Sequence, residues 1–214
     1  MANTNVAFGL RPIGVVGQGY NTTGATEYRI ASGNTNAIYQ GSPVIPLSTG
    51  FIDIVGAAAG GTVGLVGVFA GAEYVSSTTG EKIFSPYWPG SGADSNFPVK
   101  GFVYDNPLQS YVICSDATLT SASSAQGNVF ANANFADGAS GSTTTGISSA
   151  KLGVSTINTT ANLNLRIMGI QDDPENSDFT AAGIPLIVRL NNSFNSPNGA
   201  IAGGTVSTTG VKGD

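Results

Sequence analysis

Residues 100–114 have the sequence KGFVYDNPLQSYVIC, and this stretch gives the clearest indication of the fold class. It contains two runs rich in β-branched and aromatic residues, Lys100–Tyr104 and Tyr111–Cys114. Between them stands Asp105-Asn106-Pro107, a combination that strongly favours a turn. The stretch therefore predicts two short strands with a turn between them.

Similar short runs occur along most of the chain, separated by turns that contain glycine or proline. They lie at 28–30, 37–39, 43–47, 51–54, 62–69, 163–167 and 184–190. Two prolines confine the run at 43–47 to an edge strand or a strand end. The best helix candidate, Asp116–Gln126, is rich in Ser, Ala and Thr and lacks apolar residues at helical spacing. We therefore predict an all-β fold, a short-stranded sandwich or barrel with long turns and extended terminal arms.

Changes in composition suggest how the chain is organised. Residues 76–96 are crowded with Ser, Gly and Pro, and Gly138–Gly146 is a Gly/Ser/Thr tract typical of a surface loop. We expect an N-terminal β region with an extended arm at 1–75 and a loop-rich connector at 76–96. A second β sandwich or barrel unit is expected at 97–194, followed by an extended C-terminal tail at 195–214.

The chain carries very little charge. Only 10% of its 214 residues are charged, against about 25% in typical soluble domains. Its eight cations are scattered along the sequence, whereas a nucleic-acid surface needs clustered cations to displace counterions from phosphates. We therefore expect no nucleic-acid partner. Low charge suits a surface that is covered by neighbouring subunits, because fewer ions must then be desolvated on assembly.

A membrane or secretory location is not expected. Residues 54–72 are uncharged, but the six glycines in this window favour turns between short strands over a membrane-spanning helix. The N-terminus has neither the basic region nor the apolar core of a signal peptide. We expect the chain to be synthesised in a cytoplasm.

Few residues are suited to catalysis. There is no histidine, which removes the triads that depend on one. Ser148-Ser149-Ala150-Lys151 matches the S-x-x-K motif of penicillin-binding enzymes, but the motifs that accompany it are missing. The single cysteine, Cys114, lies in an apolar run and is interpreted as a small buried side chain. We predict no catalytic residues, no cofactor and no enzymatic activity.

The densest charge is the acidic run Asp172–Asp178. Carboxylates at this density can bind calcium, although the EF-hand pattern is not met. A solvated turn between two strands is the alternative interpretation. We assign no metal ligand, and calcium binding by this run stays open.

Several motifs, taken in order, resemble those of small head structural proteins of tailed bacteriophages from aquatic hosts. The resemblance extends from about residue 8 to residue 195. The motifs that carry it are Phe8–Pro12, Tyr28–Gly33, Ile38–Val44, Gly67–Gly71, Leu163–Ile167, Asp172–Asn176 and Val188–Asn191.

The resemblance implies a capsid decoration or cement protein, which binds the outer surface of the expanded head and bridges neighbouring major capsid subunits. It also implies a homotrimer, with a dimer as the alternative, on the outside of the virion. The family has no catalytic residues to transfer. The acidic balance agrees with an outer location, and synthesis is then expected in the cytoplasm of a bacterial host.

The terminal segments are the first candidates for contact with the capsid, because they carry apolar residues and little charge. We assign partner binding to Phe8, Leu10, Arg11 and Phe194. The alternative is that the N-terminal segment is simply the first strand of the fold.

Two other classes of function stay open. A phage tail or fibre component that binds a receptor would share this composition, although repeats or an aromatic cluster would then be expected. A hydrolase acting through paired carboxylates is the enzymatic alternative.

Overall fold

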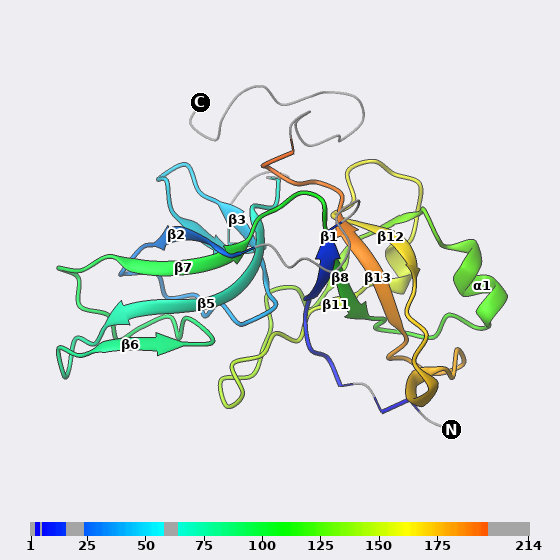
Figure 1. Cartoon of the computed structure of the whole chain (residues 1–214), viewed down its shortest axis with the longest axis horizontal. Helices are drawn as coiled ribbons and strands as arrows, with labels where there is room; N and C mark the ends of the chain where they lie inside the picture. Colours follow the sequence, from blue (N-terminus) through cyan, green and yellow to red (C-terminus); the bar gives the residue numbers. More distant parts are fainter. Residues whose placement is uncertain (1–2, 5, 16–23, 58–63, 197–214) are drawn as a thin grey trace.

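The computed structural model describes residues 3–4, 6–15, 24–57 and 64–196 (Figure 1). Within these ranges the chain forms 13 β-strands, one short α-helix and two 3₁₀-helices. The sheets are antiparallel and none closes into a barrel. The predicted all-β, sandwich-like fold is confirmed.

The first sheet has five strands and is built mainly from the second half of the chain. In spatial order these are β1 (Arg11–Val15), β8 (Gln109–Cys114), β13 (Pro185–Leu190), β12 (Leu165–Ile170) and β9 (Asn132–Ala133). A bulge interrupts the pairing of β1 with β8 between Pro12 and Gly14. Pro12 is tolerated here because β1 is an end strand of the sheet.

The second sheet has six strands, five of which form a continuous path. In order these are β2 (Thr26–Ile30), β7 (Val99–Tyr104), β5 (Gly67–Val75), β3 (Pro43–Pro46) and β4 (Ile52–Ile54), and β6 (Lys82–Ser85) pairs with the far end of β5. β3 lies between β4 and β5, and its prolines stand at its two ends. The sheet curls so that β4 approaches β2, and the side chains of Ile30 and Ile52 meet over Gly101.

The two sheets lie side by side along the long axis of the molecule, with the six-stranded sheet on the left of Figure 1. Asp105-Asn106-Pro107 connects β7 of one sheet to β8 of the other, so the strongest turn signal joins the sheets and does not form a hairpin. The Tyr111 hydroxyl donates a hydrogen bond to the Tyr104 carbonyl, 3.0 Å away, across this connection.

Two large apolar clusters form the core. One packs the five-stranded sheet against residues of the other sheet, including Ile45 and Val68. The second fills the concave side of the six-stranded sheet around Phe69 and Trp88. Because apolar residues from both sheets share the first cluster, the sheets are held together by a continuous core.

The remaining elements cover the end of the five-stranded sheet. They are β10 (Phe135–Ala136), β11 (Lys151–Leu152), α1 (Ala122–Gly127), η1 (Val154–Thr156) and η2 (Pro174–Asn176). The Ser121 side chain caps α1 by accepting from the Ser124 amide. α1 occupies only the last part of the predicted helix candidate.

Strand pairing crosses the expected domain boundaries. β1 lies in the expected N-terminal region but pairs with β8, and β7 lies in the expected second unit but pairs with β2 and β5. The expected connector contains β6. The expected C-terminal tail lies outside the described residues from 197 onwards, as do residues 62 and 63 of the run at 62–69.

Among the described residues, no helix is long and apolar enough to cross a membrane.

Candidate partner-binding surfaces

The N-terminal segment belongs to the core. β8 is apolar on both faces: Tyr111 and Ile113 face the main cluster, while Val112 and Cys114 face the opposite side. Phe8 packs against Val112 and Cys114 and covers this second face.

Leu10, next along the segment, is only 1% exposed and joins the main cluster. Its amide donates to the Gly41 carbonyl at 2.9 Å. Phe8 and Leu10 are therefore buried within their own chain, which differs from the expected role in binding a partner. The physical reason is that β8 needs cover on both faces.

Arg11 and Phe194 remain on the surface. The Arg11 guanidinium lies 4.3 Å from the centre of the Phe8 ring, a cation–π contact that closes the edge of this small cluster. Phe194 is 42% exposed and lines an apolar groove of about 250 Å³ with Tyr28, Leu47 and Phe51. The four assigned residues thus lie in two different environments and do not form one surface.

The acidic run anchors the start of the chain. The Asn3 side-chain amide donates to the backbone carbonyls of Asp178 and Ala182, and the Asp178 backbone amide donates back to the side-chain oxygen of Asn3 at 3.0 Å. The Thr4 amide donates to the side-chain oxygen of Asn176 at 2.8 Å. This anchor could not be predicted from the sequence, because the partners are far apart in the chain.

The carboxylates of this run act as local acceptors. Asp173 accepts from the Glu175 amide and the Asn176 side chain, which fixes the 3₁₀ turn. Hydrogen bonds from the Thr180 side chain and amide lower the pKa of Asp178. No three acidic, cysteine or histidine side chains are grouped to hold a metal ion in the part of the chain that the structure describes.

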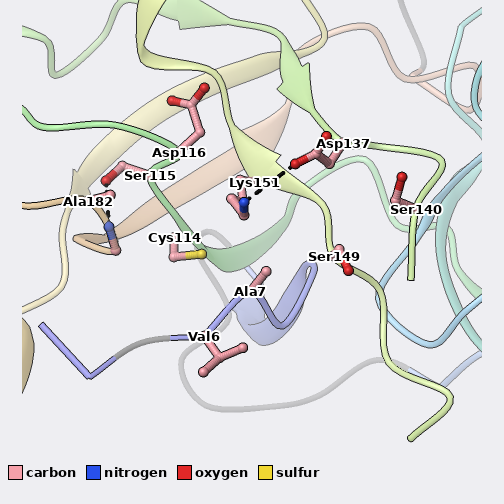
Figure 2. Close-up of a pocket in the computed structure, with 11 residues that line it drawn as sticks. Val6, Ala7, Cys114, Ser115, Asp116, Asp137, Ser140, Ser149, Lys151 and Ala182 are labelled. Atoms are coloured by element: carbon pink, nitrogen blue, oxygen red, sulfur yellow. Dashed lines mark hydrogen bonds and ion pairs between the residues drawn. The ribbon is translucent and has the colours of Figure 1, made fainter. Parts of the chain in front are cut away.

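A pocket of about 550 Å³ opens beside the N-terminal segment (Figure 2). Its lining includes side chains of the types used in catalysis, namely Cys114, Asp116, Asp137 and Lys151. Lys151 Nζ lies 3.4 Å from Asp137 Oδ2, and the Asp116 carboxylate accepts from the Val154 amide at 2.8 Å. Burial raises the pKa of the Cys114 thiol, so the thiol stays protonated and unreactive. The charged side chains Asp116, Asp137 and Lys151 therefore have structural partners.

The S-x-x-K motif does not form a nucleophile and base. Ser148 is fully buried, its hydroxyl donates to the Ser140 carbonyl at 3.4 Å, and it accepts from the Ala150 amide at 3.2 Å. No hydrogen bond joins the described side chains of Ser148 and Lys151. The serine stabilises the turn that leads into β11.

Two exposed phenylalanines were not singled out by the sequence. Phe84 in β6 is 70% exposed, and Phe130 is 75% exposed. Phe130 has a positive φ of 72°, a conformation that costs a non-glycine residue about 1–2 kcal/mol. Its amide donates to the Ile167 carbonyl at 2.8 Å, which holds the ring outward at the end of α1. Other large apolar side chains on the surface are Val6, Ile13, Phe97 and Leu108.

The outer face of the six-stranded sheet carries a row of alternating charges. Lys82 pairs with Glu73 at 2.9 Å, and Lys100 pairs with Glu27 at 3.0 Å. The hydrogen bond from Lys82 lowers the pKa of Glu73, and the hydrogen bond to Glu27 raises the pKa of Lys100. Arg29 of β2 lies beside Lys100 of β7 and is exposed. Three cations that are scattered in the sequence are therefore neighbours in the fold.

Comparison with models of known protein families, with curated proteins and with solved structures finds no match to this chain. Fold and surfaces define an all-β protein with exposed aromatic side chains and little charge.

Proposed function

We propose that this chain is a non-enzymatic structural protein of a virus capsid. It is a cement or decoration subunit that binds the outer surface of the expanded head of a tailed bacteriophage and bridges neighbouring major capsid subunits. The localisation is the outer surface of the virion.

The observation that carries this proposal is the placement of the exposed aromatic side chains. Phe84 lies on β6, and Phe130 follows α1; these two elements are at opposite ends of the long axis (Figure 1). Aromatic side chains are enriched where proteins bind one another. A subunit that bridges two neighbours needs contact residues at both ends.

The charge of the chain supports an outer location. A net charge of −5 suits the surface that faces away from packaged DNA, and the low charge density reduces the desolvation cost of a lattice contact. In the described ranges, the Ser148 and Lys151 side chains are engaged in structural bonds, so they give no support to a catalytic S-x-x-K site.

The function of a cement is differential binding. The chain holds the expanded lattice, where its composite site exists, and binds the precursor shell weakly. Purified protein mixed with expanded heads and with precursor shells is expected to sediment with the expanded heads only, and to raise the temperature at which they release DNA. Equal binding to both shells would contradict the mechanism.

Location and contact residues are tested together. Cryo-electron microscopy of virions that carry the chain is expected to place it outside the head, where capsomers meet. Phe84→Ser and Phe130→Ser are each expected to lower occupancy without lowering the unfolding temperature, because both rings are exposed. Density on the tail would instead support the tail or fibre alternative.

A further inference from the structure

The outer edge of β2 is open to pairing. β2 is an end strand of its sheet: β7 pairs with one edge, and no other described strand pairs with the second. Thr26, Glu27 and Arg29 are exposed along it, and Tyr28 is half-buried. Only the Ile30 end is buried, where Ile30 meets β4. An unpaired edge of this kind is a template for another strand.

The charges on β2 do not prevent this edge from pairing with a second copy. Edges that avoid pairing often carry charged side chains, especially lysines, and charges of one sign repel those of a second copy placed directly opposite. Glu27 and Arg29 have opposite signs and lie two residues apart, so both point to the outer face of the sheet. Arg29 makes no ion pair with any described residue, whereas Glu27 already contacts Lys100.

We propose that β2 pairs with β2 of a second copy in an antiparallel, two-fold contact centred on Tyr28. In this register each Glu27 lies opposite Arg29 of the other copy, which forms two equal ion pairs. The row of alternating charges then continues from one sheet into the next.

The charges also select the register. A shift that keeps the outer faces aligned moves the strand by two residues. Such a shift places Glu27 opposite Glu27, or Arg29 opposite Arg29, and like charges directly opposite each other are destabilising. Only the register centred on Tyr28 gives two attractive pairs.

The inner face of the edge contributes apolar contacts. The groove of about 250 Å³ beside Tyr28 is lined by apolar residues, among them Leu47, Phe51, Val66 and Phe194. Tyr28 is held in place by a 2.8 Å hydrogen bond from its hydroxyl to Asp105. In the paired arrangement, Tyr28 of the second copy lies over the groove, so ion pairs form on one face and apolar burial on the other.

This contact stands apart from the proposed capsid function, because it joins copies of the chain and needs no shell. It yields a dimer, whereas the resemblance to decoration proteins implied a homotrimer. Its failure would leave the proposed capsid function untouched.

Sedimentation of the full chain over a range of concentrations tests the contact. The unaltered protein is expected to dimerise, and raised salt is expected to weaken the dimer. Arg29→Glu and Glu27→Arg each replace two attractive pairs by two repulsive ones, and each is expected to raise the dissociation constant about tenfold or more. The double exchange Glu27→Arg/Arg29→Glu is expected to restore dimerisation.

Lys82→Glu is the matched control. It makes the same change in charge as Arg29→Glu, on the same face of the same sheet, but on β6. It is expected to leave the dimer unchanged, and circular dichroism verifies that all four variants are folded. A protein that stays monomeric, or an assembly of any size that is insensitive to both single exchanges, would overturn the proposal. So would a double exchange that fails to restore the dimer.

Discussion

Truncating Leu10 is expected to destabilise the isolated protein strongly. Leu10 is 1% exposed and packs in the core cluster with residues of both sheets, including Ile45, Val68 and Tyr111. If the N-terminal segment were an arm that orders only on a shell, the same substitution would leave the isolated protein unchanged. The stability of Leu10→Ala therefore separates the two descriptions of this segment.

The size of the effect follows from the burial. Buried Leu→Ala substitutions cost about 2–5 kcal/mol, through lost transfer free energy and the cavity that remains. Leu10 lies on backbone that is tied to Gly41 by a 2.9 Å hydrogen bond, which limits collapse around the cavity. We expect about 3 kcal/mol, a large part of the roughly 5–15 kcal/mol that stabilises a typical domain.

Urea unfolding measures this change. With a slope of about 2–3 kcal/mol per molar urea, the midpoint of Leu10→Ala is expected about 1–1.5 M below that of the unaltered protein. Val6→Ala is the control, because Val6 lies on the same segment but is 80% exposed; its effect should stay within about 0.5 kcal/mol. Equal midpoints for the two variants would refute the assignment of Leu10 to the core.

Three further predictions concern the interior. Gly141→Ala is expected to cost about 1–3 kcal/mol in urea unfolding because its Cβ would overlap the Tyr39 ring, while Gly33→Ala, which meets no atoms, should be nearly neutral. Burial raises the pKa of Tyr111 above its ordinary value of 10.0, so its contribution to stability is complete below about pH 10 and falls as the pH rises further. Above pH 10 the free energy of unfolding of Tyr111→Phe should therefore decline less steeply with pH than that of the unaltered protein. Equal slopes for the two proteins would contradict this. Cys114 should react with a thiol reagent only after unfolding, and fast labelling of the native protein would show that its burial is incomplete.

The individual strands could be predicted from the sequence, but their pairing could not. Lys100–Tyr104 and Tyr111–Cys114 coincide closely with β7 and β8, because β-branched and aromatic residues favour strands locally. Each of these strands finds its partners far along the chain, in different sheets. The local pattern contains no information about that choice, so the turn at Asp105–Pro107 was expected between two strands but not between two sheets.

The candidate site was harder to predict, because the composition hides the contrast between core and surface. Charged residues usually mark the exposed face of an element, and this chain has few of them. Ser148 and Asn132 are buried, whereas Phe84 and Phe130 are exposed, so residue type alone does not tell inside from outside here. Leu10 lies in a segment without regular apolar spacing, and its burial becomes evident only in the fold, where it joins the main cluster with Tyr111 and Ile113.

The small size of each exposed apolar site determines how the proposed cement can bind. A buried aromatic side chain contributes about 150–250 Å², whereas a stable interface covers about 1,600 Å² in total. β6, which carries Phe84, and α1, which precedes Phe130, lie at opposite ends of the long axis (Figure 1), so one compact contact does not cover both rings. Strong binding then requires a lattice that presents two neighbours at the correct distance, because the second contact forms at high effective concentration. A single free capsid subunit is therefore expected to bind the proposed cement far more weakly than an assembled shell does.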